Sequence, residues 1–214
     1  MAHSFQDFET IRSYWEHRAA TASSHKERID HSARSQRMRY ASFLEIHSLE
    51  DKSILDVGCG LADLRAELDR RKVTCEYVGF DIAQEMIRRC KLRFPGVRFE
   101  SGNIMEWQSG RSFDYVASFG IHSNVRVGAP YEMLQSMTRR QFELCSVAAH
   151  ISLLTDRFTG FDPEVQSWNA EKVLSLCLEI TPFVILRHDY LPHDFSVTLY
   201  RQPLIDRNPE ILEG

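Results

Sequence analysis

The chain has 214 residues, of which 43% are hydrophobic and 26% charged, and its formal net charge is -4. This length suits one α/β domain, and the acidic balance argues against RNA or DNA as a partner, because nucleic-acid binders usually carry a basic face. The chain starts without a signal-peptide pattern and contains no apolar run near the roughly 18 residues that span a bilayer, so we expect a soluble, cytoplasmic protein without a membrane partner.

Two helical segments precede the first strand-like run. Apolar residues between Phe5 and Ala19 recur on one helical stripe, and a second helical pattern is centred on 37–46. From Ser53 onward, short apolar runs alternate with helical ones, which indicates crossover connections and a parallel sheet with helices on both faces. The strand-like runs lie at 53–58, 75–81, 97–104, 113–120 and 145–155, and the helical runs at 62–72, 83–94, 130–143 and 169–180.

The pattern changes after the last helical run. Two strand-like runs, 183–190 and 194–201, are joined by only three residues. A connection this short cannot cross over between parallel strands, so the two runs are predicted to form an antiparallel hairpin. We therefore expect a mostly parallel sheet with one reversed terminal strand.

The stretch SILDVGCGLADL, residues 53–64, contains a strand followed by a glycine turn. Gly58 and Gly60 let the backbone turn tightly and approach a ligand closely. Asp81 ends the next strand 21 residues after Gly60, close to the roughly 20 expected of a carboxylate that binds ribose hydroxyls. A dinucleotide site would need glycine where this chain has Asp63, whose charge would repel a pyrophosphate. Together with Asp56, this favours a nucleoside with a cationic end over NAD or FAD.

Three successive stretches, ILDVGCGLADL (54–64), YVGFDIAQEMI (77–87) and RFESGNIMEW (98–107), resemble the cofactor motifs of the class I S-adenosylmethionine-dependent methyltransferases. The resemblance covers about residues 53–201. It implies an α/β, Rossmann-like fold: a seven-stranded, mostly parallel sheet with an antiparallel last strand, helices on both faces and an N-terminal helical lid. We expect a single domain over 1–214, with the lid at 1–50, the cofactor-binding core at 51–201 and a C-terminal tail at 202–214.

The resemblance implies S-adenosylmethionine as the cofactor and assigns residues to it. Asp56 and the glycine turn would line the methionine moiety, Asp81 would bind both ribose hydroxyls, and the residues after Asp81 would pack on the adenine. Asn103 stands where the family usually has aspartate; its side-chain oxygen can accept the same hydrogen bond from the adenine amine, or it can be an ordinary turn residue. The expected cofactor-binding residues are Arg39, Asp56, Gly58, Cys59, Gly60, Asp81, Ile82, Met86, Asn103, Ile104, Ser118 and Phe119.

The N-terminal helices supply further candidates. Arg39 is placed as in similar enzymes whose arginine pairs with the cofactor carboxylate; Arg37 could substitute for it and Gln36 could assist. The alternative for Arg39 is a position on a solvated helix face. Tyr14 and Trp15 are candidates for the acceptor pocket, or they belong only to the core stripe of their helix.

His122 is the first candidate for a general base. It follows the fourth strand at the edge where this family places acceptor-contacting groups, and the pKa of histidine lies near neutrality. Its alternative role is packing or capping. His150 is a second candidate for contact with the acceptor, although its strand position favours a place inside the sheet. His188, Asp189 and His193 flank the hairpin turn without the spacing of a metal site, and no C-x-x-C pair occurs, so we expect no metal.

The residues directly after the fourth strand bear on the acceptor class. The stretch SFGIHS, residues 118–123, contains neither an Asn-Pro-Pro-Tyr type of motif nor a cysteine that could act as a nucleophile. This favours O- or N-methylation of a small molecule, such as a metabolite or natural-product intermediate. The sequence predicts no particular oligomeric state. The alternatives are methylation of tRNA or protein, a non-catalytic protein that binds S-adenosylmethionine, and an oxidoreductase that binds a dinucleotide.

Overall fold

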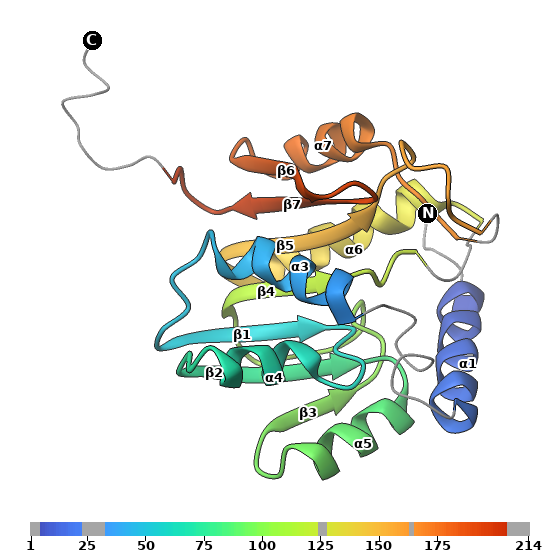
Figure 1. Cartoon of the computed structure of the whole chain (residues 1–214), viewed down its shortest axis with the longest axis vertical. Helices are drawn as coiled ribbons and strands as arrows, with labels where there is room; N and C mark the ends of the chain where they lie inside the picture. The colour runs from blue at the N-terminus through green and yellow to red at the C-terminus, as the bar shows by residue number, and fades with distance from the viewer. Residues whose placement is uncertain (1–4, 23–32, 124–127, 163–164, 205–214) are drawn as a thin grey trace.

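The computed structural model describes residues 5–22, 33–123, 128–162 and 165–204, which are built around one seven-stranded sheet (Figure 1). The strand order is β3-β2-β1-β4-β5-β7-β6. β7 alone runs opposite to the other six strands, so the predicted fold class is confirmed. The strands are β1 (Lys52–Val57), β2 (Cys75–Asp81), β3 (Arg98–Ser101), β4 (Phe113–Phe119), β5 (Cys145–Leu154), β6 (Val184–Leu191) and β7 (Asp194–Tyr200).

The predicted C-terminal hairpin is confirmed. β6 and β7 pair antiparallel, with Leu191 opposite Asp194 at the turn. The hairpin turns back into the sheet, so that β7 lies between β5 and β6 and is buried along its whole length, while β6 forms the edge. This explains why the run 194–201 is apolar with small hydroxyl side chains, because both of its faces are covered.

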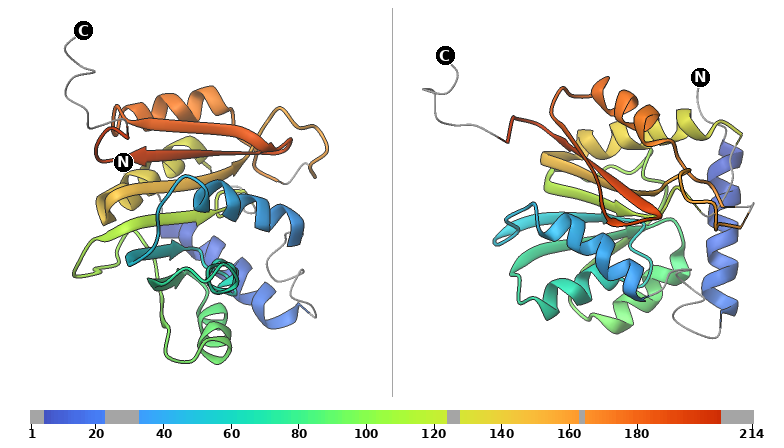
Figure 2. Two further views of the ribbon diagram at one scale, coloured as in Figure 1. Left: turned by 60° about the vertical axis from the view of Figure 1, so that its left-hand side comes forward. Right: turned by 45° about the horizontal axis from the view of Figure 1, so that its top comes forward.

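Two layers of helices cover the sheet (Figures 1 and 2). One layer contains α3 (Ala33–Leu44), α4 (Asp63–Arg70) and α5 (Gln84–Arg93), and the other contains α6 (Pro130–Leu144) and α7 (Ala170–Leu178). Neighbouring residues of β1 serve opposite layers: Ile54 packs with the first and Leu55 with the second, as strand alternation requires. None of the helices within the described ranges is long and apolar enough to cross a membrane.

Helix α1 (Phe5–Thr21) belongs to neither layer and lies across the carboxyl ends of the parallel strands (Figure 1 and the right-hand view of Figure 2). Its Glu16 carboxylate accepts hydrogen bonds from the backbone N–H groups of Gln84 (2.5 Å) and Glu85 (3.2 Å). The residue before α5, Ala83, has no side chain that can cap the helix, so Glu16 provides an acceptor and a negative charge where α5 begins. Of the two predicted lid helices, α1 therefore covers the strand ends, whereas α3 packs on the sheet.

Candidate functional site

A cleft opens beneath α1, at the carboxyl ends of β1, β2 and β4. Its empty volume, including space open to solvent, is about 1230 Å³. Its walls come from the strand ends, from α1, α3 and α6, and from the segment before α7.

Asp81 at the end of β2 is held in a fixed orientation at the wall of the cleft. Its Oδ2 accepts a hydrogen bond from the Gly60 N–H and its Oδ1 accepts one from the Ala83 N–H, both at 2.9 Å. Burial raises the pKa of Asp81 to about 6, because it leaves the charge poorly solvated. Each oxygen can accept a further hydrogen bond, so the carboxylate is positioned to receive two hydroxyl groups from a ligand.

Asp56 at the end of β1 is a second buried carboxylate in the cleft. Its Oδ2 accepts a hydrogen bond from the Tyr77 hydroxyl at 2.6 Å. The pKa of Asp56 is raised to about 7, mainly by burial and also by the nearby charge of Asp81, against the lowering effect of the Tyr77 hydrogen bond. No arginine or lysine is among the described residues that line the cleft. A cationic ligand group would therefore stabilise both ionised carboxylates.

Replacing Asp56 with asparagine is expected to stabilise the ligand-free protein more at pH 8 than at pH 5. The folded-state pKa of about 7 lies above the ordinary value of 3.8, so the stability that Asp56 contributes is fully present below pH 3.8 and is lost as the pH rises through 7. Asparagine does not titrate and still accepts from Tyr77. The free energy of unfolding of Asp56→Asn, relative to that of the wild type, should therefore rise by about 3 kcal/mol from pH 5 to pH 8, as measured by urea unfolding. The exposed-carboxylate control, Glu106→Gln, should show no such growth; an equal advantage of asparagine at both pH values would contradict the prediction.

The glycine turn after β1 has the backbone that its sequence predicts. Gly58 and Gly60 have φ angles of 72° and 54°, and Ala62 also lies in the left-handed region at 58°. A Cβ atom on Gly58 would lie 2.2 Å from the Ile121 Cγ2 atom, so a side chain at this position is excluded by contact as well as by φ. Ala62 has a side chain in the left-handed region, at a cost of about 1–2 kcal/mol.

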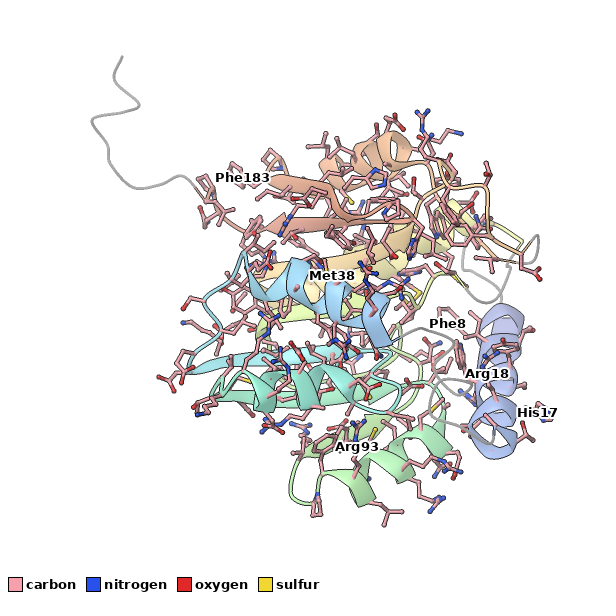
Figure 3. All side chains as sticks on the ribbon, viewed as in Figure 1. Phe8, His17, Arg18, Met38, Arg93 and Phe183 are labelled. Carbon is pink, nitrogen blue, oxygen red and sulfur yellow. The ribbon has the colours of Figure 1, made fainter. Side chains whose placement is uncertain are left out.

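Asp63 does not face the cleft, so its predicted role in repelling a pyrophosphate is wrong. Its Oδ1 pairs with the Arg93 guanidinium at 2.6 Å, and its Oδ2 accepts a hydrogen bond from the Gln36 amide at 3.1 Å. Figure 3 shows Arg93 on α5, the helix beside α4. Asp63 thereby joins α4 to α3 and α5. Repulsion of a pyrophosphate depends instead on the two buried carboxylates, Asp56 and Asp81.

The expected adenine-binding residues line one part of the cleft. They are Ile82, Met86 and Asn103, and the expected cofactor residue Ile104 lies in the lining with them. Helix α1 covers this part with Trp15, which packs against the small cluster that contains Met86. The Asn103 Oδ1 atom accepts a hydrogen bond from the Met105 N–H at 3.0 Å, so Asn103 does shape the turn after β3. Its oxygen retains one lone pair for a ligand amine. Cys59 and Phe119 also line the cleft.

His122 lines the other part of the cleft, beyond the end of β4. The side chain is 8% exposed, and its Nε2 atom has no hydrogen-bond partner among the described residues. Its ring meets the Trp168 ring edge to face, with centroids 6.3 Å apart. Burial lowers the pKa of His122 to about 4, so the imidazole is neutral at pH 7 and can accept a proton.

Arg39 does not line the cleft, which corrects the expectation that it binds a cofactor carboxylate. Its guanidinium forms two hydrogen bonds with the Asp194 carboxylate, at 2.7 and 2.9 Å, and both side chains are almost completely buried. The pair joins α3 to the start of β7. A charge already paired this way is held away from a ligand. The lining residues that α3 supplies are Gln36 and Tyr40.

Three further candidates also lie outside the cleft lining. His150 is completely buried in the sheet, where its Nδ1 atom is 2.8 Å from the Thr198 hydroxyl oxygen. Ser118 is buried, because strand alternation turns it to the face opposite Phe119. Tyr14 is exposed on α1 and accepts a hydrogen bond from the Arg18 guanidinium at 2.8 Å.

The sequence did not single out the apolar wall near His122. Met133 and Met137 stand one turn apart on α6, and Trp168 precedes α7. Phe8 completes this wall from α1, and Figure 3 shows it on the side of the helix that faces the sheet, whereas His17 points away. The spacing of the two methionines gave a signal for a buried helix face, but nothing in the sequence distinguished a core position from a cleft position.

Known proteins resemble this chain in sequence and in fold. A family model described as a methyltransferase domain matches residues 54–140. A Mycobacterium tuberculosis protein named as a methyltransferase, Rv1506c, is 29% identical over 166 residues, which cover 71% of this chain and 95% of that protein. The magnesium protoporphyrin IX methyltransferase of Synechocystis PCC 6803, solved with bound S-adenosylhomocysteine (SAH), has a similar fold, with a TM-score of 0.67 at 12% identity over 92% of this chain and all of that one. The DhpI–SAH complex has a TM-score of 0.66 at 13% identity, over 91% of this chain and 97% of that one.

Proposed function

We propose that this chain is an S-adenosylmethionine-dependent methyltransferase and that it methylates an oxygen or nitrogen atom of a small-molecule acceptor. The observation that carries the proposal is a single cleft with the Asp81 carboxylate at one part and the neutral His122 imidazole at another. Similarly folded proteins include one whose name specifies magnesium protoporphyrin IX, a small molecule, which supports this acceptor class.

The residues at the first part of the cleft fit the cofactor. Asp81 offers one free lone pair on each oxygen, which suits two neighbouring ribose hydroxyls. Asp56 is buried, and the described residues of the cleft lining include no arginine or lysine that could pair with it. Its carboxylate therefore suits the ammonium group of an amino acid. The apolar pair Ile82 and Met86 suits the flat faces of adenine.

When bound, S-adenosylmethionine supplies an electrophilic methyl group on its sulfonium. The chain then has to orient the acceptor against that methyl group and exclude water. Helix α1 covers both parts of the cleft, with Phe8 and Ile11 at the acceptor part and Trp15 at the cofactor part. Glu16 fixes this cover to α5 through two backbone hydrogen bonds.

His122 is the residue that we assign as general base. It lines the cleft, is neutral at pH 7, and has an Nε2 atom without a described partner. An imidazole in this state can accept a proton from a hydroxyl or ammonium group as the methyl group is transferred. The neighbouring Trp168 ring restricts its orientation.

The cofactor assignment is tested by calorimetric titration with SAH and with NAD. We expect micromolar or tighter binding of SAH and no heat from NAD. Binding of NAD in place of SAH would overturn the proposed function. Incubation of the enzyme with metabolite extracts and methyl-labelled S-adenosylmethionine, followed by mass spectrometry, then identifies the acceptor. A labelled tRNA or protein with no labelled small molecule would overturn the acceptor class.

Replacing His122 with alanine is expected to lower kcat by about 10²-fold or more, because general-base catalysis typically contributes 10²- to 10⁴-fold. The affinity for SAH should change less than twofold, since His122 is assigned to the acceptor and not to the cofactor. The wild-type kcat at saturating cofactor should stay level from pH 8 to pH 6 and fall only toward pH 4, where the imidazole takes up a proton. His188→Ala, at an exposed histidine on β6, is the matched control. A rate of the His122 variant equal to that of the control would assign His122 to packing alone.

A further inference from the structure

The part of the cleft around His122 is apolar on several sides. Helix α1 contributes Phe8 and Ile11, α6 contributes Met133 and Met137, and Trp168 lies beside His122. Four of these side chains belong to one hydrophobic cluster that continues into the core beneath α6, and Ile11 packs against that cluster. An acceptor that entered here would exchange water for hydrocarbon, sulfur and aromatic surface.

Charge is distributed unevenly along the cleft. Asp56 and Asp81, at the ends of β1 and β2, are the charged side chains among the described lining residues. Beside His122 the described wall presents neither a cation for an acceptor carboxylate or phosphate nor a carboxylate for an acceptor ammonium. Burying an unpaired charge in such surroundings is costly, so the described wall selects against charged acceptors.

Two polar atoms of this wall lack partners. The His122 Nε2 atom and the Trp168 Nε1 atom are both buried and make no hydrogen bond with a described residue. The indole N–H can only donate, whereas a neutral imidazole can accept. A hydroxyl group can donate a hydrogen bond to the His122 imidazole, and its oxygen can accept one from the Trp168 N–H. A carboxylate lacks the donor, and an ammonium lacks the lone pair.

We propose that the acceptor is an uncharged, largely apolar molecule that presents a hydroxyl group to His122, so that the reaction is O-methylation. This inference rests on the proposed function and narrows its acceptor from oxygen or nitrogen to oxygen. The hydroxyl oxygen forms a bond to the methyl carbon as the carbon–sulfur bond breaks, and the electron pair of that bond stays on sulfur. The hydroxyl proton passes to His122, which later releases it to water.

Binding of simple para-substituted benzenes to the enzyme saturated with SAH tests the head group. The probes 4-butylphenol, 4-butylbenzoate and 4-butylbenzylamine share one tail and present a neutral hydroxyl, an anion and a cation at pH 7.5. We expect 4-butylphenol to bind at least tenfold more tightly than either charged probe, as measured by quenching of tryptophan fluorescence and by calorimetry. A charged probe that bound as tightly as the phenol would overturn the proposal.

The tail is tested with phenol, 4-ethylphenol and 4-butylphenol. If the alkyl tail is fully buried in the cleft, each added methylene group should raise the affinity about fourfold. Ile11→Ala, on the half-buried inner side of α1, should reduce that gain, and Leu92→Ala, at an exposed leucine of α5, is the matched control. Trp168→Phe keeps an aromatic ring but lacks the N–H, so it should weaken all three phenols about fivefold and leave the gain per methylene unchanged.

The outcomes separate this inference from the proposed function. SAH binding is measured first on the same samples, and its absence would overturn the proposed function. If SAH binds but no phenol does at millimolar concentration, or if affinity is independent of tail length, the O-methylation inference alone is overturned.

Discussion

The variant Asp81→Ala is expected to bind SAH at least 100-fold more weakly than the wild type while retaining the fold. The carboxylate is positioned by the N–H groups of Gly60 and Ala83 and can accept both ribose hydroxyls. Hydrogen bonds to a charged group contribute about 1.5–3 kcal/mol each, so the loss of two corresponds to a factor of 10² to 10⁴. Calorimetric titration measures the affinity, and circular dichroism confirms that the variant is folded.

Two companion variants identify the source of the effect. Asp81→Asn keeps one carbonyl oxygen as an acceptor but removes the charge, so its affinity should lie between those of the wild type and the alanine variant. Glu76→Ala removes an exposed carboxylate of the same strand, where Glu76 pairs with Arg111, and should leave the affinity unchanged. An affinity of Asp81→Ala within threefold of this control would mean that the ribose carboxylate is misassigned.

The fold was largely predictable from the sequence because it depends on local patterns. The alternation of apolar runs with helical stripes predicted the parallel sheet, and the three residues between 190 and 194 predicted the hairpin. These signals are local, since the period of a strand or helix and the length of a connection can be read within a short window. Even the turn after β1 was predicted, because its glycines reflect backbone angles rather than distant contacts.

The errors at the site concern contacts between residues far apart in the sequence. Arg39 and Asp194 are 155 residues apart, so no local pattern showed that the arginine has a buried partner. The position of Asp63, where a dinucleotide-binding turn has its third glycine, suggested a charge that faces the ligand. In the structure its partners are instead on α3 and α5. Such pairings depend on how the helices pack, which the sequence pattern does not specify.

The apolar wall near His122 was not predictable for a different reason. Phe8, Met133 and Trp168 have the hydrophobic character expected of core residues, and they are in fact continuous with the core. Whether such a residue borders a cavity depends on the volume left between elements, which sequence periodicity does not report. Ser118 and Phe119 show the same limit within one strand. They lie on opposite faces of β4, and only Phe119 lines the cleft.

Replacing Gly58 with alanine is expected to destabilise the protein by about 3 kcal/mol or more. The added Cβ atom would lie 2.2 Å from the Ile121 Cγ2 atom, and the φ angle of 72° is unfavourable for alanine. Overpacking typically costs about 1–3 kcal/mol, and a residue strained in the left-handed region adds about 1–2 kcal/mol. Urea unfolding of the ligand-free protein measures the total.

Matched variants separate the two contributions. Gly110 has a φ angle of 70° and no atom within 4 Å of a Cβ position, so Gly110→Ala should show only the cost of the backbone angle. The clash should be relieved by Ile121→Leu, which lacks a methyl group on Cβ, and not by Ile121→Val, which retains it. In a double-mutant cycle, Gly58→Ala should therefore couple favourably with leucine at position 121 and not with valine. Equal stability changes for Gly58→Ala and Gly110→Ala would contradict the predicted contact. Coupling with leucine alone would indicate that Gly58 is required because Ile121 of the cleft wall lies directly against the glycine turn after β1.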